Sequence, residues 1–117
     1  MTNPISKRLL DALLACRAIR QFTEDMDFSA YDANLLVQSA VERQFENIGE
    51  ALGRAADADP TLVERFPDLR SIVGLRNRII HGYDSVDQEI LWDIVQSKMP
   101  ALEVRITEFL AADDCTT

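Results

Sequence analysis

The sequence predicts an all-α domain, an antiparallel bundle of four to five helices. Apolar residues recur at the three- and four-residue spacing of helices and rarely alternate as they would in strands. Gly and Pro fall between the helical stretches, where they are expected to end them. A chain of 117 residues can bury one modest core, so we expect a single domain over residues 1–117.

The first helix is expected over residues 4–22. Asn3 is a suitable N-cap, and Pro4 suits the first helical position, where no backbone N–H is needed. The apolar side chains of this helix recur on one face. This stripe consists of Ile5, Leu9, Leu13, Cys16 and Ile19, broadened by Leu10 and Leu14.

The second helix is expected over residues 28–58, with Asp27 as candidate cap. A helix of about 30 residues spans ~45 Å and cannot bury that length alone, so it is the expected spine of the bundle. Gly49 and Gly53, with nearby alanines, make its C-terminal half thin. This indicates either a close helix crossing at a dimer interface or, more simply, close packing within one chain.

The rest of the chain supplies three further helical pieces. A short piece is expected over residues 60–66, and a fourth helix over residues 68–81, ended by Gly82. Ser85 then opens a fifth helix, because Gln88 three residues later completes a capping-box pattern. Pro100 is expected to kink this last helix or divide it in two.

Charge and composition restrict the class of protein. The formal net charge of −8 argues against a protein that coats nucleic acid, although it allows a nuclease with a small basic site. Cys16 and Cys115 are too few for a disulfide scaffold, so free thiols in a reducing cytoplasm are expected. No apolar run approaches the ~18 residues of a membrane span.

The fourth helix carries an unusual arginine. On a helical wheel its apolar residues share one arc, and Arg76 falls inside that arc, whereas Arg78 falls on the opposite face. An unpaired buried guanidinium is costly, because arginine does not shed its charge. Arg76 therefore either pairs with a carboxylate of the long helix, such as Glu46 or Glu50, or meets an anionic ligand such as phosphate.

His81 is the only histidine, and it falls at the C-terminal end of the same helix. Its ordinary pKa near ~6.5 suits proton transfer at neutral pH, although a lone histidine is more often a surface or packing residue. Tyr83 follows just past Gly82 and by default is a loop aromatic. No metal or other cofactor is expected, since the chain has no second His and no spaced Cys pair.

Residues 76–83, RNRIIHGY, resemble the R-x4-H-x-Y motif of the HepT-like toxins, which belong to the HEPN superfamily of helical nucleases. Residues 46–51 resemble the long-helix signature of that family, and Trp92 with residues 99–102 resembles its last helix. The resemblance covers residues from about 5 to 110. It departs where many relatives carry a Pro-Trp pair and this chain has Pro67-Asp68.

The resemblance implies a HEPN-like homodimer with two sites in a shared cleft and metal-independent cleavage of RNA, often tRNA. It implies that Arg76 and His81 are catalytic, with Arg76 holding the phosphate and His81 transferring a proton. Asn77 is implied as a supporting residue, and Arg78 as an RNA contact. Because the net charge is acidic, basic character is expected to be confined to the cleft, with contributions from Lys98 or Arg70.

The resemblance also implies a partner. Such toxins are usually encoded beside a minimal nucleotidyltransferase antitoxin, which can transfer AMP onto the motif tyrosine, here Tyr83. Toxin and antitoxin could assemble into a larger hetero-oligomer. Two alternatives remain open: a non-catalytic substrate-binding subunit of a nucleotidyltransferase, and a structural helical dimer in which Arg76 is merely salt-bridged.

Overall fold

The computed structural model describes residues 4–80 and 87–115, and all regular structure in these two stretches is helical. In chain order the helices are α1 Pro4–Phe22, α2 Phe28–Asp32, α3 Leu35–Ala58, α4 Leu62–Arg65, α5 Leu69–Ile80, α6 Gln88–Ser97 and α7 Met99–Cys115. The predicted all-α fold is therefore confirmed.

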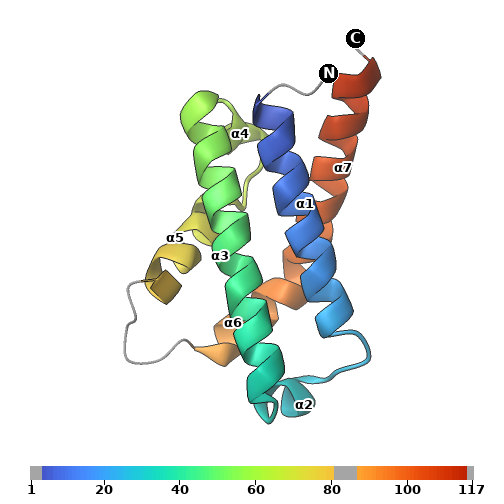
Figure 1. Ribbon diagram of the computed structural model, residues 1–117, viewed down its shortest axis with the longest axis vertical. Coiled ribbons are helices and arrows are strands. Elements are labelled where there is room, and N and C mark those ends of the chain that lie inside the picture. Colours follow the sequence, from blue (N-terminus) through green and yellow to red (C-terminus); the bar gives the residue numbers. More distant parts are fainter. Residues whose placement is uncertain (1–3, 81–86, 116–117) are drawn as a thin grey trace.

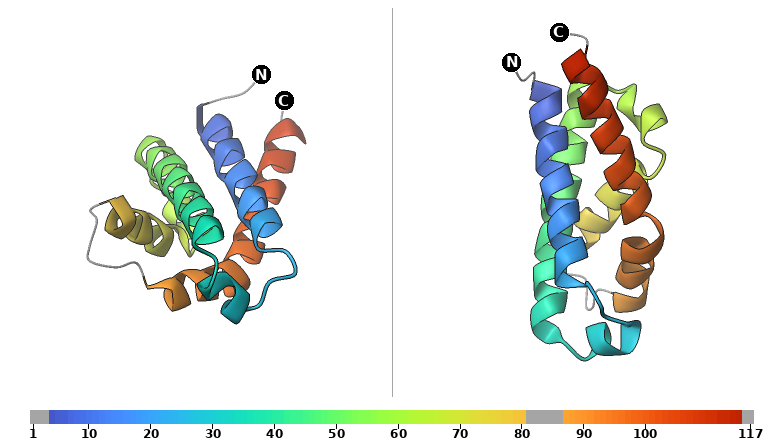
Figure 2. Two further views of the ribbon diagram at one scale, coloured as in Figure 1. Left: turned by 60° about the horizontal axis from the view of Figure 1, so that its bottom comes forward. Right: turned by 90° about the vertical axis from the view of Figure 1, so that its right-hand side faces the viewer.

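Three long helices form the body of the molecule (Figure 1). α1 and α3 lie side by side and antiparallel, and α7 flanks α1 on its other side. The short helix α5 packs on α3, while α6 passes behind the lower half of α3 in the view of Figure 1. Both ends of the described chain lie at the same end of the bundle (Figure 2).

One face of α3 supplies the centre of the core. Val41, Phe45, Ile48 and Leu52 recur every three or four residues and are fully buried. Burying such a side chain stabilises a protein by about 1.5–3 kcal/mol, so this stripe holds the bundle together. The stripe of α1 is narrower than predicted: Leu10 and Leu14 were expected to broaden it, yet both are exposed.

The long helix predicted over residues 28–58 is broken into α2 and α3, and the single-helix prediction was wrong. Asn34 is the N-cap of α3, and its side-chain oxygen accepts a hydrogen bond from Val37 N at 3.0 Å. The Gln38 side chain, from the first turn of α3, donates to Tyr31 O and Asp32 O at the end of α2. Capping side chains therefore outweigh the helical apolar pattern at this point.

The start of α6 is fixed by two polar residues. Asp87, not the predicted Ser85, is the N-cap, and its side chain accepts from Glu89 N and Ile90 N. Gln88 accepts from the hydroxyl of buried Tyr31 at 2.6 Å and donates to Glu42 at 2.9 Å. These bonds tie α6 to both α2 and α3.

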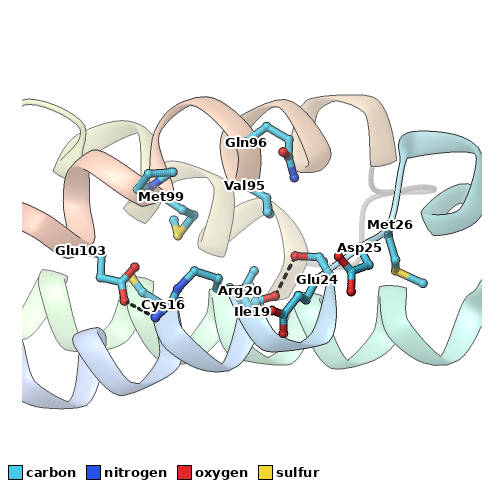
Figure 3. Close-up of a pocket in the computed structure, with 12 residues that line it drawn as sticks. Cys16, Ile19, Arg20, Glu24, Asp25, Met26, Val95, Gln96, Met99 and Glu103 are labelled. Carbon is cyan, nitrogen blue, oxygen red and sulfur yellow. Dashed lines mark hydrogen bonds and ion pairs between the residues drawn. The ribbon is translucent and has the colours of Figure 1, made fainter.

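The predicted interruption at Pro100 is confirmed, because α6 ends at Ser97 and α7 begins at Met99. Pro100 lies in the first turn of α7, where its missing N–H costs no hydrogen bond. On the inner side of this elbow a cavity of about 290 Å³ separates α1 from α6 and α7 (Figure 3). Buried side chains of Cys16, Val95 and Met99 line it, and the ion pair between Arg20 and Glu103 lies at its edge.

Candidate functional site

Helix α5 presents the candidate residues. Leu69, Ile72 and Leu75 are buried and fix the helix on the core, as the predicted apolar arc requires. Arg76 lies within that arc and is only partly exposed, whereas Arg78 is exposed. These exposures agree with the prediction that Arg76 falls inside the apolar arc and Arg78 on the opposite face.

Arg76 lies unusually close to α3 because of Gly49. A Cβ placed on Gly49 would lie 2.3 Å from Arg76 Cβ and 2.5 Å from its Cγ, closer than real Cβ contacts allow. The missing side chain of Gly49 therefore makes room for the stem of Arg76. The sequence left two interpretations of the small residues in the C-terminal half of α3, a dimer interface or close packing within one chain. At Gly49 the structure shows close packing within the chain.

The guanidinium of Arg76 is incompletely satisfied. Its NH1 donates to Asn77 Oδ1 at 3.1 Å, and its NH2 lies 3.4 Å from Glu50 Oε2. Its Nε is buried and has no acceptor among the described residues. The side chain is 27% exposed. The side chain is therefore partly open to solvent, although its Nε is buried.

The carboxylate that holds Arg76 is Glu50, one of the two partners predicted. The other, Glu46, pairs with Arg43 at 3.1 Å instead. Glu50 is itself shared, because its Oε1 lies 3.0 Å from both Nε and NH2 of Arg54. Arg54 was not singled out in the sequence, although its spacing four residues after Glu50 is a known signal for a helical ion pair.

The other predicted residues are only partly placed. Arg78 is exposed and has no ion pair among the described residues. Arg70 is also exposed, whereas Lys98 lies 3.8 Å from Asp68 and so is less available to a ligand. His81 and Tyr83 lie outside the described residues, so the pairing of Arg76 with His81 stays a prediction.

The elbow cavity is separate from this site, because none of the residues that line it belongs to α3 or α5. Burial raises the pKa of the Cys16 thiol to about 12, with a smaller contribution from Glu103. Such a thiol stays protonated and is a poor nucleophile near neutral pH. Cys16 therefore gives this cavity no reactive thiol near neutral pH.

Within residues 4–80 and 87–115, no group of three or more His, Cys, Asp or Glu side chains could hold a metal ion. None of the helices formed by these residues has the length and apolar character needed to cross a membrane.

Fold and site together define a small all-α protein that offers a partly exposed guanidinium to an anion. The chain belongs to the HepT-like ribonuclease family. The family model described as "Ribonuclease HepT-like" matches residues 12–109, which covers most of the chain. The chain is accordingly a ribonuclease by family.

Individual relatives agree with this family. The protein named "Putative RNase MJ1380" of Methanocaldococcus jannaschii is 35% identical over 100 residues, which cover 84% of this chain and 89% of the relative. "Putative RNase MJ0127" of the same organism is 34% identical over 94 residues, 79% of this chain and 75% of the relative. "Probable ribonuclease HepT" of Thermococcus cleftensis is 32% identical over 95 residues, 81% and 86% of the two chains. No solved structure gave a significant match to the chain.

Proposed function

We propose that the chain is a metal-independent endoribonuclease and the toxin of a toxin–antitoxin system, acting on cytoplasmic RNA such as tRNA. The observation that carries this proposal is the partly exposed Arg76 guanidinium, which donates to Asn77 at 3.1 Å and lies in a long ion pair with Glu50 at 3.4 Å. Five residues further along the chain is its only histidine, His81. Membership of a ribonuclease family supports the same assignment.

In the proposed reaction the 2′-hydroxyl of a ribonucleotide attacks the adjacent phosphorus. The bond to the 5′-oxygen breaks, which leaves a 2′,3′-cyclic phosphate and a 5′-hydroxyl. His81 takes the proton of the attacking hydroxyl, and the departing 5′-oxygen takes a proton from water. Arg76 donates to the phosphate oxygens and stabilises the charge that develops on them. Asn77 orients the guanidinium through the bond from NH1, and Arg78 supplies a second contact to the RNA backbone.

The proposal extends to partners. Two protomers pair so that both sites line one cleft, and a nucleotidyltransferase antitoxin binds the dimer in a larger hetero-oligomer. The antitoxin transfers AMP from ATP to the phenolic oxygen of Tyr83, and pyrophosphate leaves. Because Tyr83 follows His81 by two residues, the added charge and bulk would exclude an RNA phosphate.

Purified protein with tRNA in EDTA tests the activity, beside the Arg76→Ala and His81→Ala variants. Mass spectrometry first confirms that Tyr83 carries no AMP. We expect the wild type to cut tRNA and each variant to lose about 100-fold or more in rate, the usual effect of removing one group that stabilises the transition state. Single-stranded DNA is expected to stay intact, since it has no 2′-hydroxyl.

The competing functions give different results. If the unmodified wild type binds tRNA without cutting it, the chain is a substrate-binding subunit and not a nuclease. If it neither binds nor cuts RNA, Arg76 is a structural salt bridge. Sedimentation of the same preparation tests the dimer, and incubation with the antitoxin and labelled ATP tests the transfer to Tyr83.

A further inference from the structure

The carboxylate of Glu50 is divided between two guanidinium groups on neighbouring helices. Its Oε1 lies 3.0 Å from Arg54, one turn further along α3, whereas its Oε2 lies 3.4 Å from Arg76 on α5. The contact to Arg54 is the shorter one and involves two nitrogens of Arg54. The carboxylate is thus held more closely by Arg54 than by Arg76.

The hold of Glu50 on Arg76 is weak enough to be exchanged. Glu50 is 48% exposed and Arg54 57% exposed, so water screens both charges. The stem of Arg76, by contrast, is fixed against Gly49. An incoming phosphate can therefore take the place of the Glu50 oxygen at NH2 while the guanidinium stays where it is, and two oxygens of the phosphate can receive two N–H groups.

We propose that Glu50 is a positioning residue that holds Arg76 until an RNA phosphate replaces it, and that Arg54 neutralises Glu50 when the phosphate is bound. This inference rests on the proposed function, because it names the groups that prepare Arg76 for RNA. Glu50 competes with the phosphate for the same guanidinium. Arg54 lowers the repulsion between the displaced carboxylate and the phosphate.

The two partners of one ion pair should then have opposite effects. Removing the carboxylate in Glu50→Gln removes the competitor and tightens RNA binding about fivefold, the size of one close charge pair at a solvated surface. Removing the cation in Arg54→Gln leaves Glu50 uncompensated and weakens binding by a similar factor. A purely structural ion pair would give changes in the same direction, since either substitution breaks it.

Binding is measured with a single-stranded oligonucleotide whose riboses are 2′-O-methylated, so that it cannot be cut. Arg54→Lys keeps the positive charge and should restore binding close to that of the wild type. Arg43→Gln and Glu46→Gln break a second surface pair on the same helix, at 3.1 Å, that does not touch Arg76, and both should leave binding unchanged. Thermal unfolding confirms that each variant is folded.

Cleavage of the matching unmethylated RNA separates the effects further. We expect Glu50→Gln to lower KM and also kcat, because Arg76 loses the group that orients it. Arg54→Gln should raise KM and leave kcat nearly unchanged. The difference between the two variants should narrow as salt is added, since both charges are exposed.

The inference is overturned if Glu50→Gln and Arg54→Gln shift binding in the same direction, if the Arg43→Gln control moves it as much, or if the folded wild type does not bind the oligonucleotide. These results are separate from the proposed activity. If the wild type cuts RNA but the two variants shift binding in the same direction, the proposed nuclease activity stands and the proposed role of Glu50 falls. If the wild type binds RNA without cutting it and the two variants shift binding in opposite directions, the role of Glu50 is kept and the nuclease activity is lost.

Discussion

At the scale of single residues, the candidate site depends on a glycine, Gly49, whose lack of a side chain leaves room for Arg76. Gly49 has no Cβ, and that space is filled by the Cβ and Cγ of Arg76. A charged side chain can therefore lie inside an apolar arc, because its stem packs on backbone while the side chain stays partly exposed. Gly53, one turn later on α3, has no neighbour within 4 Å of a Cβ placed on it.

These two glycines give a matched pair of substitutions. Gly49→Ala is expected to lower the free energy of unfolding by about 1–3 kcal/mol, because α5 must move away from α3 to admit the methyl group. Gly53→Ala should raise it by about 0.5–1 kcal/mol, the gain from replacing glycine in an open helix position. Urea unfolding measures both, and equal effects at the two positions would contradict the packing described.

Cys16 gives a prediction about pH. Burial raises its pKa from the ordinary 9.0 to about 12, so above pH 9 the unfolded thiol loses its proton while the folded one keeps it. The free energy of unfolding should therefore fall as pH rises from about 9 towards 12, by at most about 1.4 kcal/mol per pH unit.

Cys16→Ala should flatten this fall between pH 9 and 10. Burial also raises the pKa of Tyr31 above its ordinary value of 10.0, so at higher pH the tyrosine adds a second, independent loss of stability. Urea titrations at pH 8, 9 and 10 measure the slope for both proteins. Identical slopes would show that the thiol is not buried as described.

At the scale of helices, the sequence predicted those helix bounds that depend on the spacing of residues along the chain. The bounds of α1 and the interruption at Pro100 agree with the predictions, because they follow from an apolar period and from proline chemistry. The break between α2 and α3 was not predicted, because Asn34 and Gln38 act through side-chain hydrogen bonds that the apolar period does not register.

For the candidate site too, the sequence predicted the features that depend on spacing along one helix but not those that depend on the distance between two helices. The place of Arg76 in an apolar arc followed from helical spacing. Glu50 was one of two carboxylates suggested as its partner, and the structure brings Arg76 and Glu50 together. The sharing of Glu50 with Arg54 and the contact with Gly49 did not follow, because they depend on the depth at which α5 lies on α3. Helix spacing along one chain carries no information about that distance.

The hydrogen bonds around Gln88 make a prediction at the scale of helices. Tyr31→Phe removes the donor to Gln88 Oε1 and should lower the free energy of unfolding by about 1 kcal/mol. The double variant Tyr31→Phe, Gln88→Leu should cost less than the sum of the two single changes, because they break the same bond. Additive costs would show that the link between α2 and α6 contributes nothing.

At the scale of the whole molecule, the net charge of −8 and the proposed RNA substrate have to be reconciled. Most of the described cations are engaged: Arg17 and Arg20 share Glu103, and Arg43 pairs with Glu46. A surface of this kind repels a polyanion at long range, so binding depends on few local contacts. The affinity for RNA should then vary only weakly with salt.

Arg78 tests this at one position. Each phosphate contact to single-stranded nucleic acid contributes about −0.7 to the slope of log affinity against log salt. Arg78→Gln should therefore make the slope of the proposed RNA binding shallower by about 0.7, since Arg78 is exposed on the helix that carries Arg76. The measurement is binding of the 2′-O-methylated oligonucleotide at several salt concentrations.

Arg105→Gln is the matched control, because Arg105 is equally charged and exposed but lies on α7, which carries none of the candidate residues. It changes the net charge by the same unit and should leave the slope as it is in the wild type. If both substitutions shift the slope equally, the RNA senses the total charge of the protein, and a local basic site around α5 is excluded.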